Sequence, residues 1–215
     1  MDWIQQLQSA NWHRATGCVL GAYLLGCFAT GYYLVRVRTG KDLRQMETGA
    51  IGARNAGRVL GKTGFAITLL GDFGKGALAV WLAREWTGDH RLALLALLAV
   101  VFGHIWPVQL RFHGGKGVAT SLGALLAFDY RVALVFPALF LLGFALVRKS
   151  LLPAMFAFAC LPMVAWCFGC GNFTVAVLAI LTVMILFAHR RNLTAEFTAL
   201  MARRATTPKP EQPKL

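Results

Sequence analysis

The sequence predicts an all-α integral membrane protein with seven transmembrane helices, the fourth of them short. The N-terminus is expected outside and the C-terminus in the cytoplasm. Three observations predict this fold class: the composition, the length of the apolar blocks and the distribution of positive charge. Of the 215 residues, 57% are hydrophobic and 14% are charged. Soluble domains contain about 25% charged residues, so most of this chain is expected to lie in a bilayer.

Seven apolar blocks follow one another along the chain. They are residues 16–35, 63–83, 92–110, 117–128, 132–147, 151–169 and 173–188. All except the fourth have 16 to 21 residues, close to the roughly 20 that a spanning helix requires. The short fourth block suits either a tilted helix in a locally thin membrane or a re-entrant half-span.

The distribution of Lys and Arg decides between these alternatives. With seven crossings, the inside segments carry seventeen Lys and Arg and the outside segments carry four. Cytoplasmic loops of membrane proteins are enriched in these residues. If the fourth block did not cross, Arg148, Lys149, Arg190 and Arg191 would all lie outside and the bias would collapse. The charge pattern therefore favours seven crossings.

No domain boundary interrupts residues 1–193, which are expected to form a single membrane domain. Residues 194–215 are predicted to be a cytoplasmic tail, disordered in its Pro-rich last part, about 206–215. The polar, aromatic start of the chain does not resemble a signal peptide. The formal net charge of +13 would suit nucleic-acid binding. That class is excluded because the charge is sorted by topology and not gathered on one soluble face.

Four of the five cysteines lie inside or at the end of apolar blocks, and CFGC places Cys167 and Cys170 close together. A zinc site would need a second pair or neighbouring histidines, so no metal is expected. The cysteines are interpreted as structural or incidental. A short-range disulfide between Cys167 and Cys170 is the alternative.

Glycine-rich stretches with cations are concentrated on the predicted inside face. The first, ETGAIGARNAGRVLGKTG (47–64), has a flexible backbone whose N–H groups could form an anion-binding nest, with Arg54, Arg58 and Lys62 adding charge. Part of it, GRVLGKT, looks like the phosphate loop of nucleotide hydrolases. That motif requires Gly where Ala56 stands and a strand before it, so ATP binding is excluded.

The second stretch is FHGGKGVAT (112–120), in which Lys116 is flanked by Gly114, Gly115 and Gly117. A helix starting here would present unpaired N–H groups and the positive end of its dipole beside a lysine. This combination predicts an anion site. The alternative is a flexible loop whose lysine extends to the lipid headgroups.

The third stretch, HRRNL (189–193), follows the last apolar block. His189 and Asn192 are three residues apart and would share one helical face, while Arg190 and Arg191 are interpreted as headgroup anchors. His189 and Asn192 are therefore expected to face the same membrane level as the two glycine stretches.

A fourth feature, GDFGKG (71–76), puts Asp72 and Lys75 inside a predicted span. Their spacing allows an ion pair on one helix face, and charges within spans are costly unless paired or functional. We expect a structural pair facing a polar interior. His104, near the inner end of the third span, is expected to face the same interior, whereas His113 is interpreted as an interfacial residue.

These four stretches, in this order, resemble the bacterial acyl-phosphate:glycerol-3-phosphate acyltransferases over roughly residues 18–193. GHIWPVQLRFHGGKGVATSLGALLA is the most specific part and matches the family's second motif nearly throughout. Family members lie in the inner membrane and transfer a fatty acyl group from acyl phosphate to the 1-hydroxyl of glycerol 3-phosphate. The resemblance implies lysophosphatidic acid and phosphate as products, a cytoplasmic active site and no cofactor. The expected partners are the two substrates and membrane lipids, with no nucleic acid and a monomeric protein.

The resemblance assigns roles residue by residue. Catalytic positions match Lys116, Arg58, His189 and Asn192. Phosphate binding is expected from Thr48, Gly49, Asn55, Gly114, Gly115 and Gly117, with Arg54 as an addition, and support from Asp72, Lys75 and His104. The first motif departs from the family pattern, because Ala50 replaces an asparagine and Arg54 a threonine. The Gly-Thr-Glu ending of the third motif is absent. These departures leave the identity of the acceptor open.

Acyl phosphate is already activated, and no Ser-His-Asp or Cys-His arrangement is evident in the sequence. Direct attack by the acceptor hydroxyl, without an acyl-enzyme, is therefore expected. Protein cations would stabilise the leaving phosphate, and a substrate phosphate oxygen or His189 would take the proton. Three alternatives remain: another polar acceptor, a catalytically inactive scaffold, and an anion or lipid transporter, against which no internal repeat is found.

Overall fold

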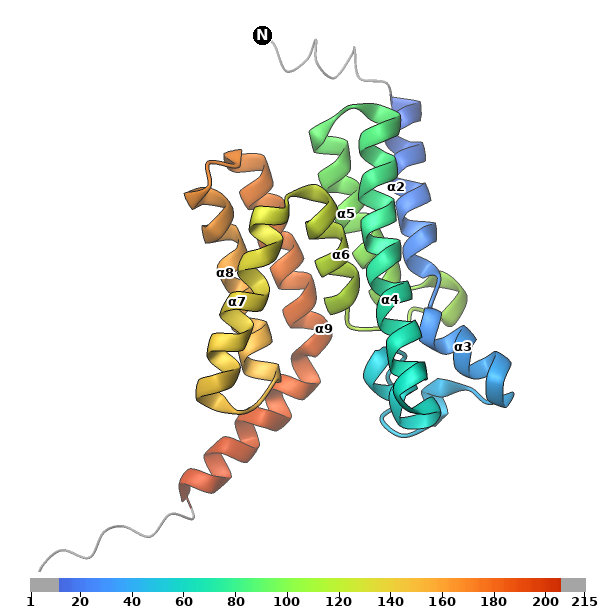
Figure 1. The fold of residues 1–215 in the computed structure, drawn as a ribbon, viewed down its shortest axis with the longest axis vertical. Coiled ribbons are helices and arrows are strands. Elements are labelled where there is room, and N and C mark those ends of the chain that lie inside the picture. The colour runs from blue at the N-terminus through green and yellow to red at the C-terminus, as the bar shows by residue number, and fades with distance from the viewer. Residues whose placement is uncertain (1–11, 206–215) are drawn as a thin grey trace, which may run out of the picture.

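The structure is a computed structural model that describes residues 12–205, where all regular structure is helical. The helices form two groups that stand side by side (Figure 1). The first group contains α2 (Trp12–Cys27), α3 (Thr30–Thr39), α4 (Ala53–Thr87), α5 (His90–Ile105) and α6 (Val118–Phe128), with the short 3₁₀ helices η1 (Leu43–Gln45) and η2 (Val108–Leu110). The second contains α7 (Tyr130–Val147), α8 (Leu151–Cys167) and α9 (Gly171–Ala205). The segment predicted to be disordered, about 206–215, lies outside the described residues.

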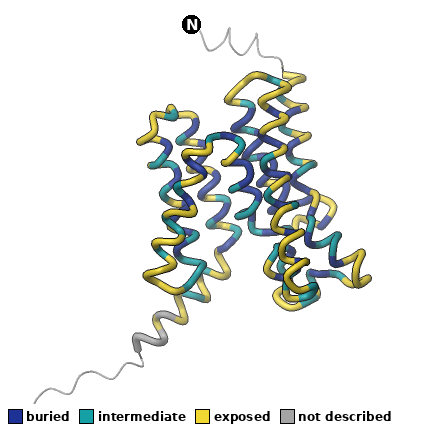
Figure 2. Tube along the Cα trace, in the orientation of Figure 1, coloured by how far each residue is buried: buried dark blue, intermediate teal, exposed yellow. Residues whose placement is uncertain are grey.

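Five segments within this range are long and apolar enough to cross a membrane. They are Trp12–Thr39, Ala53–Thr87, His90–Leu110, Tyr130–Val147 and Gly171–Ala199. The other two apolar helices, α6 and α8, have 11 and 17 residues. The outward faces of the helices are exposed while the centre of the first group is buried (Figure 2). Exposed apolar side chains such as Leu70, Leu134 and Met163 are suited to contact lipid. The prediction of an all-helical membrane protein is confirmed.

The central helix is α5, most of whose residues are buried, including Leu94, Leu97 and Val100, whereas Phe102 is exposed. A helix that is apolar all round is typical of a buried or membrane-spanning segment. Leu181 and Ile185 of α9 belong to the same hydrophobic core. This core joins the two groups of helices and fixes the end of α5 close to α9.

The first predicted span is interrupted, which the sequence analysis did not predict. Helix α2 ends at Cys27 and α3 begins at Thr30, after which α3 runs away from the bundle (Figure 1). The carbonyl of Phe28, at the break, accepts a hydrogen bond of 2.6 Å from the Nζ atom of Lys75. An unpaired backbone carbonyl is costly inside a membrane, so Lys75 makes this break tolerable.

Glycines bring α6 into backbone contact with α4. A Cβ atom on Gly76 would lie 2.1 Å from the carbonyl oxygen of Thr120, and one on Gly123 would lie 1.9 Å from that of Phe73. Small residues allow such close approach between membrane helices. The short helix α6 is therefore held by α4, and the glycine before it, Gly117, lies against Ile185 of α9.

The stretch 47–64 is only partly the glycine nest that the sequence predicts. From Ala53 onward it is helical, and α4 bends at Gly61, which has φ 69° and ψ −161°. Helical geometry uses the backbone N–H groups internally beyond the first turn. The cations Arg54 and Arg58 therefore project from a helix and not from a loop. They lie on a short first segment that is bent away from the span.

The cysteines take no part in a disulfide. All five are free thiols, among them Cys167 and Cys170 at the end of α8. The alternative of a short-range bridge between these two is therefore not what the structure contains.

Candidate active site

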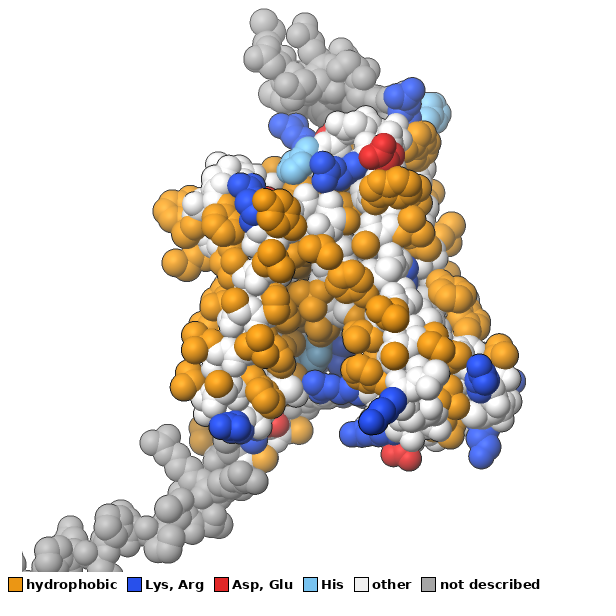
Figure 3. Space-filling model, in the orientation of Figure 1, with side chains coloured by type: hydrophobic (Ala, Val, Ile, Leu, Met, Phe, Trp, Pro, Cys, Tyr) orange, Lys and Arg blue, Asp and Glu red, His pale blue; other side chains and the backbone are white. Residues whose placement is uncertain are grey.

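Three segments approach one another: the loop before α6, the first turns of α4, and α9. Lys116, Arg54 and His189, one from each segment, interact electrostatically. The surface is hollowed between the two groups of helices, with cationic and histidine side chains at the base of the hollow (Figure 3).

Gly114 and Gly115 pack the loop onto the last turn of α5. Their N–H groups donate to the carbonyls of Ile105 (3.1 Å) and His104 (3.0 Å), respectively. A Cβ atom on Gly114 would lie 2.2 Å from the His104 carbonyl oxygen, and one on Gly115 would lie 2.0 Å from His104 Nε2. The two N–H groups expected to bind phosphate are thus already used. In this structure both glycines pack closely against the last turn of α5.

Gly117 begins α6 in the left-handed conformation, with φ 82°. The first helical bond runs from the N–H of Ser121 to the carbonyl of Gly117, at 2.8 Å. The N–H groups of the preceding residues, 118–120, belong to the first turn, which has no intrahelical acceptors. The helix therefore presents its positive end next to Lys116, as expected. A Cβ atom on Gly117 would lie 2.8 Å from Cδ1 of Ile185, so this helix end abuts α9.

Lys116 is partly buried, and burial lowers the pKa of its ammonium group, with a further lowering from the positive charge of Arg54. His189 is buried and also interacts electrostatically with Lys116 and Arg54. Within residues 12–205, none of the ion pairs includes Lys116, Arg54 or Arg58. The site thus holds positive charge that no carboxylate neutralises, which favours an anionic ligand.

The His189 ring has a defined tautomer. Its Nδ1 atom lies 2.9 Å from the carbonyl oxygen of Ile185, one turn earlier in α9. A carbonyl can only accept, so Nδ1 carries a proton and Nε2 of the neutral ring is free to accept one. Asn192 lies one turn further along α9 and is exposed. Helix α9 continues past both residues, so His189 and Asn192 are three residues apart on one helix, as expected.

Arg54 connects the two groups of helices. Its Nη2 atom donates to the hydroxyl of Ser150 at 3.0 Å, in the turn between α7 and α8. Arg54, Arg58 and Lys62 also line an open depression along the first part of α4. Lys116 is not among the residues that line it. Lys116 and His189 both lie within electrostatic reach of Arg54. Arg58 lies one turn after Arg54 in α4.

Asn55 is buried and its side-chain amide shapes the segment before α4. The Oδ1 atom accepts from the N–H (3.2 Å) and hydroxyl (3.0 Å) of Thr48, and Nδ2 donates to the carbonyls of Met46 (3.1 Å) and Leu43 (3.4 Å). Gly49 has φ 69° and donates its N–H to Met46. These three residues, expected to contact phosphate, hold the loop in place through bonds within it.

The predicted pair of Asp72 and Lys75 is confirmed, with Nζ 3.0 Å from Oδ1 and both side chains buried. His104 joins it, since its Nδ1 atom lies 2.8 Å from Lys75 Nζ. Thr30 donates its hydroxyl to Asp72 at 3.2 Å. This buried group links α3, α4 and α5 behind the glycine loop.

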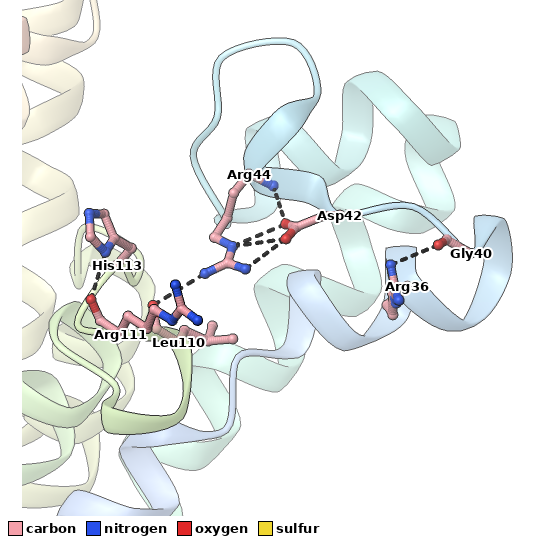
Figure 4. A network of polar contacts seen from close by, with 7 residues as sticks. All are labelled: Arg36, Gly40, Asp42, Arg44, Leu110, Arg111 and His113. Carbon is pink, nitrogen blue, oxygen red and sulfur yellow. Dashed lines mark hydrogen bonds and ion pairs between the residues drawn. The ribbon is translucent and has the colours of Figure 1, made fainter.

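A second polar cluster, unpredicted from the sequence, joins the segment after α3 to the segment after α5 (Figure 4). Arg44 binds both carboxylate oxygens of Asp42 and donates to the carbonyl of Leu110 at 3.2 Å. Its hydrogen bonds hold the pKa of the Asp42 carboxyl below its usual range. His113 is exposed and bonds to the carbonyl of Arg111. The sequence indicates only the local Asp42–Arg44 pair, which is two residues apart. The other partner of Arg44, the carbonyl of Leu110, is 66 residues away.

Comparison with known proteins identifies relatives over most of the chain. The glycerol-3-phosphate acyltransferase family profile matches residues 16–198. Glycerol-3-phosphate acyltransferase 1 of Desulfitobacterium hafniense (strain Y51) is 45% identical over 175 residues, which cover 81% of this chain and 87% of that protein. The glycerol-3-phosphate acyltransferase of Nitrobacter winogradskyi is 42% identical over 172 residues, covering 80% and 86%.

Solved structures agree with the sequence relatives. The chain is similar to the crystal structure of PlsY, an integral membrane glycerol 3-phosphate acyltransferase, in its glycerol 3-phosphate form. The TM-score is 0.79 at 32% identity, over 86% of this chain and 92% of that chain. The lysophosphatidic acid form of the same enzyme gives 0.77 at 30% identity. The chain therefore belongs to the glycerol-3-phosphate acyltransferase family and is a membrane acyltransferase.

Proposed function

We propose that the protein transfers a fatty acyl group from acyl phosphate to the 1-hydroxyl of glycerol 3-phosphate, giving lysophosphatidic acid and inorganic phosphate. The observation that carries the donor assignment is the unneutralised positive charge of Lys116 and Arg54 at the N-terminus of α6. Both substrates of this reaction bear phosphate. Such a site would offset the repulsion between them.

The reaction needs no covalent intermediate on the protein. The acceptor hydroxyl oxygen bonds to the acyl carbon, and the bond from that carbon to the phosphate oxygen breaks. The leaving phosphate keeps the electron pair, and Lys116, Arg54 and the N–H groups of the first turn of α6 stabilise its charge. Lys116 also attracts the phosphate of glycerol 3-phosphate, and Arg58 and Asn192 are assigned to the same acceptor side. The hydroxyl proton goes to His189 Nε2 or to a phosphate oxygen, and the free lone pair on Nε2 supports the first route.

The orientation proposed for the chain has seven crossings, with α6 and α8 counted as spans, an outside N-terminus and an inner-face site in the bacterial plasma membrane. One membrane domain, 1–193, is followed by a cytoplasmic tail, the first part of which continues α9. The excess of Lys and Arg on the inside supports this arrangement. We expect a membrane-impermeant maleimide to label the exposed thiol of Cys167 in intact spheroplasts. Labelling only after the membrane is opened would reverse the orientation.

The purified protein in detergent tests the donor and the acceptor together. With palmitoyl phosphate and glycerol 3-phosphate, we expect lysophosphatidic acid and inorganic phosphate in equal amounts, and no product from an acyl thioester. Preference for a thioester would overturn the donor. Ala50 and Arg54 differ from the family pattern. Other polar alcohols and phosphate esters should therefore be compared with glycerol 3-phosphate as acceptors in a parallel competition assay. Net acyl transfer to none of them would leave only a transporter or scaffold.

Arg54→Thr is expected to move the high-pH limb of the activity profile to higher pH. A neutral amine does not attract phosphate, so wild-type activity falls as pH rises through the lowered pKa of Lys116. Removing Arg54 removes one of the two causes of that lowering and raises the pKa of Lys116. A pH–rate profile measures the shift, with the exposed Arg38→Thr as a matched control. Superimposable high-pH limbs would show that Arg54 does not act on Lys116.

A further inference from the structure

His104 lies between the buried ion pair and the glycine loop, and it contacts both. It belongs to the last turn of α5 and is buried. On one side its Nδ1 atom is 2.8 Å from Lys75 Nζ. On the other, its Nε2 atom faces Gly115, next to the lysine of the proposed phosphate site.

Lys75 determines how the His104 ring is held. An ammonium group has three N–H donors and no acceptor. Within the described structure its partners are Asp72 Oδ1 at 3.0 Å, the Phe28 carbonyl at 2.6 Å and His104 Nδ1 at 2.8 Å. Nδ1 of His104 must therefore accept, which places the ring proton on Nε2, on the side of the loop. Asp72 and Lys75 thus fix both the orientation and the tautomer of the ring.

The ring in turn defines the surface on which the loop rests. A Cβ atom on Gly115 would lie 2.0 Å from Nε2 and 2.6 Å from Cε1 of His104. The ring is therefore in direct contact with the Gly115 backbone. The carbonyl of the same histidine accepts the N–H of Gly115, and that of Ile105 accepts the N–H of Gly114. One turn of α5 fixes the two residues before Lys116.

We propose that His104 is a positioning residue for acyl transfer: its ring, held by Lys75 and Asp72, supports Gly115 and so sets the place of Lys116 at the start of α6. The inference rests on the proposed role of Lys116 in binding phosphate. This role accounts for the charged pair of Asp72 and Lys75 inside a membrane span. A pair that only satisfied the Phe28 carbonyl at the helix break would need no histidine. A small displacement of a binding group lowers affinity and rate together.

Two substitutions of His104 separate its two contacts. The amide of His104→Asn reaches the position of Nδ1 and accepts from Lys75, but it leaves the space over Gly115 empty. The longer amide of His104→Gln reaches toward the position of Nε2. His113→Ala is the matched control, because His113 lies in the same loop and is exposed. The readouts are the KM and the equilibrium Kd of glycerol 3-phosphate, the Ki of inorganic phosphate, and thermal unfolding in detergent.

We expect His104→Asn to raise the Kd and KM of glycerol 3-phosphate and the Ki of phosphate by about tenfold or more. His104→Gln is expected to lose less, and His113→Ala nothing. Wild-type constants in His104→Asn would overturn the proposal. So would a loss of kcat with unchanged KM, Kd and Ki, because that result means fewer folded molecules. The Kd of glycerol 3-phosphate can be measured without turnover. If the wild-type protein binds glycerol 3-phosphate but is inactive, the proposed reaction is refuted. The role of His104 is then still tested by comparing the Kd values of the wild type and the variants.

Compensation from the loop side provides a second test of the contact between the His104 ring and Gly115. Gly115→Ala introduces a methyl group that collides with the His104 ring, since the atoms that crowd this position all belong to that side chain. We expect it to weaken glycerol 3-phosphate binding. In the double variant with His104→Asn the ring is gone, so binding should recover relative to Gly115→Ala alone. Additive losses would contradict direct contact between ring and loop.

Discussion

Replacement of Lys116 by alanine is expected to lower turnover by about 100-fold or more while the protein stays folded, an effect of the size seen when one group that stabilises developing charge is removed. Lys116 lies beside the positive end of α6 and has no carboxylate partner in the described structure. Its loss therefore removes phosphate-binding charge without leaving an unpaired acid. Initial rates of phosphate release from acyl phosphate, with glycerol 3-phosphate present, measure the effect.

Two further variants show whether the loss is specific to the charge of Lys116. Lys116→Arg keeps the charge with a different shape and is expected to retain part of the activity. Lys41→Ala removes an exposed lysine outside the proposed site and should leave the rate unchanged. If Lys116→Ala turned over at the wild-type rate, the phosphate site would have to lie elsewhere.

Lys75→Met is expected to destabilise the protein by about 3–5 kcal/mol, the usual cost of removing one partner of a buried ion pair. Without the ammonium group, the Asp72 carboxylate keeps the hydroxyl of Thr30 and the ring of His104, whose Nδ1 atom is 3.6 Å from Oδ1. The Phe28 carbonyl at the helix break loses its donor. Thermal unfolding in detergent measures the loss, and reduced accumulation in the membrane should accompany it.

The matched control is Lys62→Met, which changes an exposed lysine of the same helix and should not alter the unfolding temperature. The double variant Asp72→Asn/Lys75→Met should be more stable than Lys75→Met alone, because it removes the unpaired carboxylate. An unfolding temperature for Lys75→Met equal to that of the wild type would mean that the buried group does not hold the break between α2 and α3.

Local spacing allowed part of this structure to be predicted. The i,i+3 relation of Asp72 and Lys75 depends only on helix geometry, and the pair is present. The positive helix end beside Lys116 follows from glycines placed before an apolar block. Both features involve residues that are neighbours in sequence, so no knowledge of the tertiary fold was needed.

Features that depend on distant partners could not be predicted in this way. The break after α2 is tolerated because Lys75, 47 residues later, satisfies the Phe28 carbonyl. Gly114 and Gly115 looked like phosphate ligands, but contact with the end of α5 uses their N–H groups. The bond from Arg54 to Ser150 spans 96 residues. In each case the partner is set by helix packing, which sequence periodicity does not specify.

The first motif illustrates how a functional pattern can also be structural. Asn55 and Thr48 match family positions, and the amide of Asn55 is bonded to the segment that precedes α4. A side chain that shapes a loop and one that touches substrate look the same in a sequence motif. Only the hydrogen-bond partners distinguish them.

The structure of the wild-type chain bound to glycerol 3-phosphate tests the central claim most directly. The account predicts phosphate oxygens at about 3 Å, hydrogen-bond distance, from Lys116 Nζ or from the N–H groups of the first turn of α6. A phosphate bound instead in the cavity lined by Arg36 and Lys41, with Lys116 unoccupied, would contradict it.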